Sequence, residues 1–261
     1  MNVLILSTSP RKSCSTSLYF SNLLKLVLPR ARCKIICLKT AHDCEAAIAA
    51  LPETDTVVFA SPVYVDTLPS TTLEHLKKLE AHLAKSDCHF DVYALLNCGF
   101  YEGHQCALAL NTYALWCARA GVAWRGGIGV GSGVMLGFIR FLPLLGLAIT
   151  VVPLLLHAAV LAFSGGFSFS ALFSGYFPIT LFSQTLVWIL FSMGAFLNIF
   201  RLGTAISARR QQPLRYTTAW FCPRFLFVFM ASCYWILRAL LLHGTLPWQL
   251  FQKNYFLKER L

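Results

Sequence analysis

Charged residues are divided very unequally along this chain. Residues 1–137 carry 12 Lys and Arg against 10 Asp and Glu, an ordinary balance for a soluble domain. From Phe138 onward there are 10 Lys and Arg but one acid, Glu259. Basic clusters between long apolar runs are typical of membrane proteins, because arginines gather at the ends of spans. We therefore predict two domains, 1–137 and 138–261, and attribute the excess positive charge to membrane topology rather than to nucleic-acid binding.

Two runs in the second domain are long enough to cross a bilayer. Residues 141–163 contain no charged side chain, and at about 1.5 Å per residue they exceed a hydrocarbon core of about 30 Å. An uncharged turn rich in Gly, Ser and Phe follows at 164–175, and a second uncharged run occupies 177–200. The sequence thus predicts two spans that leave and return on the cytosolic side. The basic segment 201–215 is interpreted as a determinant of that topology.

The segment 219–243 is ambiguous. It is apolar, but Arg224 and Arg238 lie inside it. A full third span would let both arginines snorkel to the interfaces, yet it would put the basic C-terminal residues outside, against the positive-inside bias. An interfacial or re-entrant helix would keep those residues in the cytosol. The sequence leaves two and three spans open.

Short apolar runs alternate with helical patterns in the first domain. This alternation favours a parallel, doubly wound α/β sheet of five strands. Ligands of such sheets bind beyond the carboxyl ends of the strands. Polar loops follow the first, third and fourth strands, so they are expected to converge at that edge. The strands are predicted near 3–6, 34–38, 56–60, 92–96 and 123–130.

The loop after the first strand reads S-T-S-P-R-K-S-C-S-T-S, residues 7–17. Its hydroxyls, its backbone N–H groups and the N-terminus of the following helix suit a phosphate. The glycine patterns of dinucleotide sites and of P-loops are missing, which favours a mononucleotide phosphate over a pyrophosphate. The same residues also fit a simple capped helix after a strand. Both interpretations are open at this point.

Three motifs in order resemble the flavodoxin-like NAD(P)H-dependent FMN reductase family. They are S-P-R-K-S-C-S-T-S from Ser9, D-T-V-V-F-A-S-P-V-Y-V-D-T-L-P from Asp55, and N-C-G-F-Y-E from Asn97, and the likeness covers residues 1 to about 133. The resemblance implies a flavodoxin-like fold, an FMN cofactor and NADH or NADPH as co-substrate. It also implies a homodimer, because flavin sites of this family lie partly at dimer interfaces.

By position, the resemblance assigns cofactor-binding residues in each loop. The FMN phosphate would be held by Ser9, Arg11, Ser15, Thr16 and Ser17. The isoalloxazine would lie between Pro62, Val63 and Tyr64 on one side and Asn97, Cys98, Gly99 and Phe100 on the other, with Glu102 nearby.

Some of these residues have two readings. Tyr64 suits stacking on a flavin, but it also fits a turn. Cys98 is either a reactive thiol at the flavin edge or a small residue packed against the ring. The first loop has Thr8 where the family has glycine.

Metal chemistry is not expected. The ten cysteines include no C-x-x-C pair, and the seven histidines show no ligand spacing, so no metal, iron–sulfur cluster or haem is predicted. The N-terminus shows no signal peptide, so the first domain is expected in the cytoplasm, with reduced thiols.

The predicted protein is a multi-pass cell-membrane oxidoreductase whose FMN passes hydride from NAD(P)H to a small acceptor such as a quinone. Its expected partners are the lipid bilayer and that acceptor, and no side chain is assigned as catalytic. One alternative is a non-enzymatic flavodoxin-like electron carrier for a membrane partner. Another is a domain that has lost its cofactor and serves assembly.

Overall fold

The computed structural model describes residues 1–11, 15–141, 143–144, 146–148, 151, 155, 159, 176–218 and 223–243. These residues fall into two compact units, Met1–Phe221 and Cys222–Leu261. Most of the predicted span 141–163 and the whole predicted turn 164–175 lie outside the described residues. The folded unit continues well past residue 137, where the sequence placed the end of the first domain.

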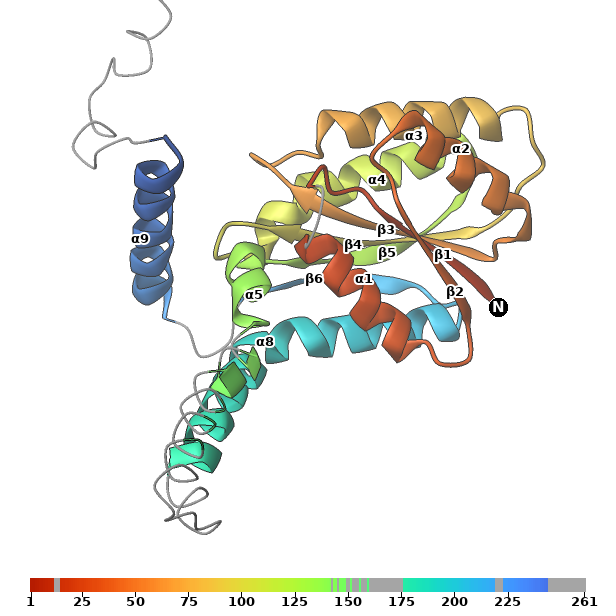
Figure 1. The fold of residues 1–261 in the computed structure, drawn as a ribbon. Helices are drawn as coiled ribbons and strands as arrows, with labels where there is room; N and C mark the ends of the chain where they lie inside the picture. The colour runs from red at the N-terminus through yellow and green to blue at the C-terminus, as the bar shows by residue number, and fades with distance from the viewer. Residues whose placement is uncertain are drawn as a thin grey trace, which may run out of the picture. The chain divides into compact units, whose positions relative to one another are not determined.

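A parallel sheet with the strand order β2-β1-β3-β4-β5-β6 forms the centre of the first unit (Figure 1). The first five strands have the order 2-1-3-4-5 of flavodoxin-like folds, so the predicted architecture is confirmed. The predicted number of five strands is wrong, because a sixth strand pairs in parallel with β5. The strands are β1 (Asn2–Ser7), β2 (Arg32–Cys37), β3 (Thr56–Val63), β4 (Asp91–Cys98), β5 (Ala123–Val130) and β6 (Gln212–Thr217).

Helices cover both faces of the sheet, as a parallel sheet requires (Figure 1). One face carries α2 (Ala41–Ala50), α3 (Ser70–Leu83) and α4 (Ala107–Ala120), and the other carries α1 (Thr16–Val27), α5 (Gly133–Ile139) and α8 (Tyr176–Ser207). Short 3-10 turns occur at η1 (Leu51–Glu53) and η2 (Gly103–Cys106).

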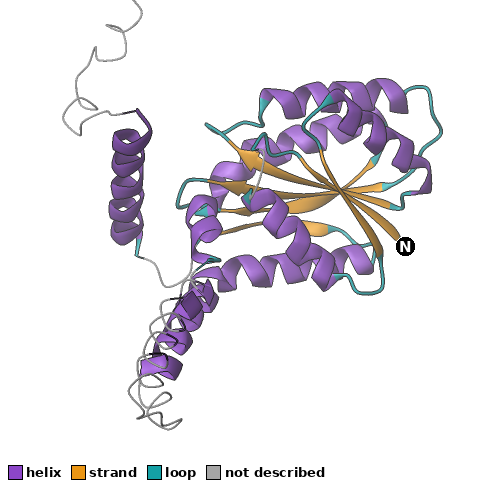
Figure 2. Cartoon of the chain, in the orientation of Figure 1, coloured by secondary structure: helices purple, strands orange, loops and turns teal. Residues whose placement is uncertain are grey.

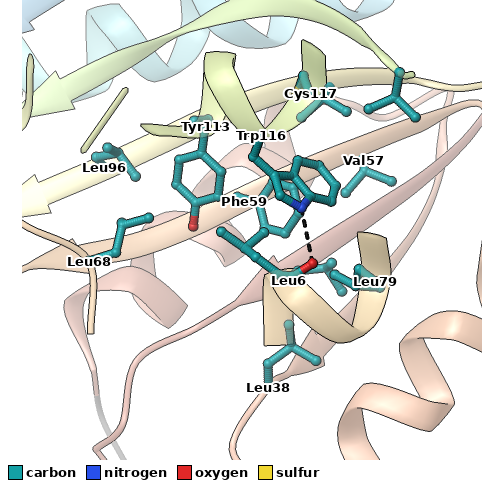
Figure 3. Packing of buried hydrophobic residues seen from close by; sticks show 14 of the residues in the cluster. Leu6, Leu38, Val57, Phe59, Leu68, Leu79, Leu96, Tyr113, Trp116 and Cys117 are labelled. Carbon is teal, nitrogen blue, oxygen red and sulfur yellow. Dashed lines mark hydrogen bonds between the residues drawn. The ribbon is translucent and has the colours of Figure 1, made fainter. Parts of the chain in front are cut away.

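Aromatic side chains fill the core on the α3 and α4 face (Figure 3). Phe59 stacks on Tyr113 with ring centroids 4.7 Å apart and meets Trp116 edge-on at 5.4 Å. The Trp116 indole donates a hydrogen bond of 3.0 Å to the Leu76 carbonyl, which satisfies its polar end inside the core. These contacts join β3 to α3 and α4.

Helix α8 was expected as a membrane span over 177–200, but its packing against the sheet was not predicted. Its C-terminal half packs into the core between α1 and the sheet, through the buried residues Ala195, Ile199, Leu202, Ala205 and Ile206. The predicted span 177–200 therefore overlaps a segment that covers the sheet. Its N-terminal half instead exposes apolar side chains, including Phe182 and Leu186.

The chain after α8 is held tightly before it enters β6. Arg209 pairs with Asp55 at 2.6 Å between Nη2 and Oδ1, and the Tyr93 hydroxyl donates 2.8 Å to the Arg210 carbonyl. Gly126 has φ of 100° and a Cβ there would lie 1.9 Å from the Gln212 carbonyl oxygen. Only glycine allows this approach of β6 to β5.

The second unit contains α9 (Arg224–His243). Two of the described helical segments are long and apolar enough to cross a membrane: Phe182–Ser207, with a mean hydropathy of 1.7, and Arg224–Leu241, with 1.6. By length and composition alone, a core helix passes the same test, and the C-terminal half of α8 is such a core helix. The third span stays a prediction.

Replacement of a core leucine of α8 should destabilise the first unit. Leu202 is fully buried, so Leu202→Ala should lower the free energy of unfolding by about 2–5 kcal/mol. Leu197→Ala is the matched control, because Leu197 is 37% exposed on the same helix and its loss should cost far less. Thermal unfolding in detergent measures both. Equal losses would show that α8 does not complete the core.

Candidate functional site

The carboxyl ends of β1, β3 and β4 lie side by side at one edge of the sheet, because these strands are neighbours in the order. Their loops gather at the strand tips (Figure 2). The structure therefore brings together the three loops that the sequence singled out.

The first loop offers donors at the start of α1. The Ser15 hydroxyl caps the helix by accepting 3.1 Å from the Leu18 N–H, and the Ser9 hydroxyl accepts 3.4 Å from the Arg11 N–H. Because both hydroxyls accept in these bonds, each still has its hydrogen to donate. The amides of Thr16 and Ser17 have no partner within the helix, as at any helix start.

The hydroxyls of Thr16 and Ser17 have a different task from the one that the sequence suggested. Thr16 Oγ1 donates 3.0 Å to the Gly133 carbonyl, and Ser17 Oγ donates 2.8 Å to Asn97 Oδ1. These two bonds tie α1 to α5 and to β4. Only the backbone amides of Thr16 and Ser17 are left for an anion.

The second loop makes a tight turn at the rim. Tyr64 and Thr67 exchange backbone hydrogen bonds of 2.9 and 3.2 Å, and Val65 and Asp66 between them have φ of 49° and 62°. A β-branched residue at positive φ is a rare, strained conformation of the kind found at functional sites. Tyr64 lies in a turn and is 42% exposed, so its ring is also available for stacking.

Pro62 and Val63, by contrast, are buried. The Val63 side chain belongs to the core on the α3 and α4 face. It can border a ligand only through its backbone.

The third loop mixes buried and exposed residues. Cys98 is 1% exposed, and its thiol donates 3.5 Å to the Glu102 carbonyl and lies against Cys106. The hydrogen bond between the two thiols lowers the pKa of Cys98 and, together with burial, raises the pKa of Cys106. A buried, hydrogen-bonded thiol fits the reading of Cys98 as a small packed residue. Phe100 is 49% exposed at the rim, and Glu102 is also exposed.

Sequence reasoning missed the residues beneath these loops. Thr8 Oγ1 donates 2.8 Å to Ser61 Oγ, which is hydrogen-bonded in turn to the Tyr113 hydroxyl. Burial raises the pKa of Tyr113, which keeps this phenol neutral. The chain of hydroxyls explains why the first loop has Thr8 where glycine was expected.

The turn between β5 and α5 was also missed. Buried Ser132, with φ of 59°, donates its N–H to the Phe100 carbonyl at 2.5 Å. A Cβ at Gly133 would lie 2.9 Å from the Cys98 carbonyl oxygen, and one at Gly137 would lie 2.6 Å from Thr16 Oγ1. The two glycines let α5 pack closely on the site. The sequence G-S-G at 131–133 was the available signal.

The residues present fit an FMN phosphate. Free hydroxyl hydrogens on Ser9 and Ser15, first-turn amides of a twelve-residue helix and the Arg11 side chain all favour an anion. No Asp or Glu occurs between Ser7 and Ser17 to oppose it. Among the described residues, no cluster of three His, Cys, Asp or Glu side chains could hold a metal ion.

Solved structures with a similar fold cover about half of this chain. An NADPH-quinone reductase from P. pentosaceus is 13% identical, with a TM-score of 0.42 over 51% of this chain and 86% of that one. A flavodoxin, WrbA-like protein from Agrobacterium tumefaciens is 13% identical, with 0.37 over 47% and 75%. An azoreductase from Bacillus anthracis is 15% identical, with 0.35 over 51% and 87%.

Comparisons with protein-family profiles and with curated protein sequences gave no match. The strand order identifies the fold independently of these similarities.

Loss of the Ser17–Asn97 bond should loosen the site. Ser17→Ala leaves the buried Asn97 Oδ1 without this donor, so unfolding should become easier by about 1–3 kcal/mol. Ser21→Ala is the control on the same helix, since the hydroxyl of buried Ser21 bonds only to the Ser17 backbone carbonyl. Denaturant titration of both variants provides the test. A neutral Ser17→Ala with intact folding would contradict the proposed tie between the loops.

Proposed function

We propose that the chain is a membrane-anchored flavoprotein that uses FMN to pass hydride from NADH or NADPH to a small acceptor such as a quinone. The observation that carries the proposal is the cradle of donors at the start of α1, flanked by the 62–67 and 97–102 loops at the carboxyl edge of a flavodoxin-order sheet. The motif resemblance supports the choice of FMN among mononucleotides.

The residues have separate roles in this proposal. Ser9, Ser15 and Arg11, with the amides of Thr16 and Ser17, bind the phosphate. Tyr64 stacks on the ring and shields it from water, and the backbone of residues 97–100 forms the opposite wall. A bound FMN would supply the redox chemistry, which is the acceptance of hydride at its N5. The chain then contributes position and polarity rather than an acid or base.

Pre-organisation of the site supports this division of labour. The bonds Thr16–Gly133, Ser17–Asn97 and Ser132–Phe100 fix the loops relative to one another before any ligand binds. A planar ring held between fixed walls loses less free energy on binding than one that must order its own loops.

Membrane anchoring rests on separate evidence. No Asp, Glu, Lys or Arg occurs between Arg140 and Arg201, and exposed apolar residues line the N-terminal half of α8. The lipid bilayer as a partner and a cytoplasmic location of the flavin domain are part of the proposal, and Arg140 at the start of this uncharged run supports them.

The non-enzymatic carrier is the second candidate. The same cradle would hold FMN in a carrier, and no catalytic side chain distinguishes the two. A carrier needs a separate reductase, whereas the proposed enzyme is reduced directly by NAD(P)H.

The phosphate cradle is tested by comparing FMN with riboflavin, which lacks the phosphate. The double variant Ser9→Ala, Arg11→Gln removes a hydroxyl and a positive charge, so the affinity for FMN should fall at least about tenfold. Riboflavin affinity should stay the same, because its ring contacts remain. Quenching of flavin fluorescence measures both affinities.

Arg30→Gln is the matched control, since it removes the same charge from an exposed residue between α1 and β2, at the opposite edge of the sheet. It should leave both affinities unchanged. Parallel losses of FMN and riboflavin in the double variant, or no loss of either, would contradict the assignment of this loop to the phosphate.

A further inference from the structure

Helix α8 runs alongside α1 in the same direction. Near the end of α1, a Cβ at Gly203 would lie 2.5 Å from Val27. Near the start of α1, Trp188 lies beside the Tyr19 hydroxyl. The residues of α8 before Trp188 therefore extend beyond the start of α1. That end of α1 is the carboxyl edge of the sheet, where the candidate site lies (Figure 1).

The chain leaves the domain at the same place. The Arg140 guanidinium, directly after α5, lies 5.2 Å from the centre of the Tyr19 ring and 4.6 Å from that of Phe141. Further along, Gly146 lies against Gln184, because a Cβ there would be 3.0 Å from Gln184 Cγ. The outgoing and returning segments thus start together at Tyr19 and continue side by side away from the sheet.

The chemistry of this junction changes abruptly. Beyond Arg140 and Trp188, the described side chains at the surface are largely apolar, and they include Leu144, Leu147, Phe182 and Leu186. Arg, Tyr and Trp are the residue types that gather at lipid–water interfaces, and here the Tyr19 hydroxyl, Arg140 Nε and the Trp188 indole nitrogen are buried where the three side chains meet. We call Tyr19, Arg140 and Trp188 the junction cluster.

We propose that the junction cluster lies at the lipid–water interface and that the carboxyl edge of the sheet faces the bilayer. Lipid is the occupant that fits, because the intervening chain carries no Asp, Glu, Lys or Arg and both of its ends emerge on one side of the domain. The crossover between β5 and β6 then contains the membrane anchor, and two attachment points fix the orientation of the domain.

This orientation has a consequence for the site. Tyr64, Val65 and Phe100 are exposed at the edge that would face the lipid headgroups. An acceptor dissolved in the bilayer would reach the site from that side. This part rests on the proposed function, whereas the orientation itself does not.

Two basic residues of the 201–215 segment, Arg201 and Arg210, lie toward the other edge of the sheet. Arg201 lies 13 residues after Trp188, which is about 20 Å along a helix, and Arg210 precedes the first residue of β6. These arginines would stand away from the bilayer surface. They would thus be poorly placed as the juxtamembrane topology signal that the sequence suggested.

Fluorescence quenching by lipids tests the orientation. A genetically encoded fluorescent amino acid is introduced into the full chain at Val65, which is 84% exposed at the carboxyl edge, or at exposed Asp87, in the loop that leads to the start of β4. Each protein is reconstituted into nanodiscs of neutral and anionic phospholipid that also contain lipids with a nitroxide on the headgroup. The label at 65 should lose much more fluorescence than the label at 87.

Equal loss at both positions, greater loss at 87 or no loss at either would overturn the proposal. The variant Arg140→Glu provides a second test, because a carboxylate at the interface of anionic lipid should reduce quenching at 65. The control Arg119→Glu changes a partly exposed residue on the opposite face and should not. Unchanged quenching in Arg140→Glu would show that the junction cluster does not lie at the lipid–water interface.

The outcome is independent of the flavin. If FMN fails to bind while the label at 65 is quenched, the proposed function fails and the orientation stands. If FMN binds and the labels show no difference, the orientation fails alone.

Discussion

Burial of the second face of the sheet is the constraint on which the rest of the structure depends. A parallel sheet is stable only when helices cover both faces. Directly after β5 the chain supplies the short helix α5, with Leu136 in the core. The remaining cover comes from Ile199, Leu202 and Ile206 of α8, more than sixty residues further along the chain. The apolar segment between α5 and the C-terminal half of α8 is therefore an insertion within the fold, and the elements on both sides of it pack into the same core.

The same packing positions the site. Helix α5 reaches α1 through Gly133 and Gly137, and the turn before α5 holds the Phe100 carbonyl. The Thr16 and Ser17 hydroxyls link the start of α1 to Gly133 of α5 and to Asn97 of β4. The backbone amides of Thr16 and Ser17 stay free for an anion. Loops that bind a flat cofactor need such support, because a ring held between mobile walls would lose binding free energy to their ordering.

Much of this could be predicted from sequence, since five apolar runs alternating with helical patterns indicate a parallel sheet and three polar loops mark its carboxyl edge. The sixth strand could not, because Q-P-L-R-Y-T has the proline and arginine of an edge strand and resembles a basic linker.

It could also not be predicted that one half of α8 is exposed and the other half is buried against the sheet. Both halves are rich in apolar residues, and the packing of residues such as Ile199, Leu202 and Ile206 against the sheet distinguishes the C-terminal half. The roles of the individual hydroxyls could not be predicted for a similar reason. Ser9 and Ser17 are the same residue type in one loop sequence, but Ser17 is the one that donates a hydrogen bond to Asn97. The sequence pattern thus indicates which residues lie at a site, whereas the hydrogen bonds in the structure determine which of their polar groups are available to a ligand.

The most direct measurement is the absorbance spectrum of the full-length protein in detergent, recorded before and after anaerobic addition of NADPH and then NADH. A membrane-anchored FMN oxidoreductase should show flavin bands that bleach within seconds with at least one of the two nucleotides. Bands that persist with both would contradict the enzyme and favour the carrier. Absence of flavin bands, even after incubation with FMN, would contradict the account of the site itself.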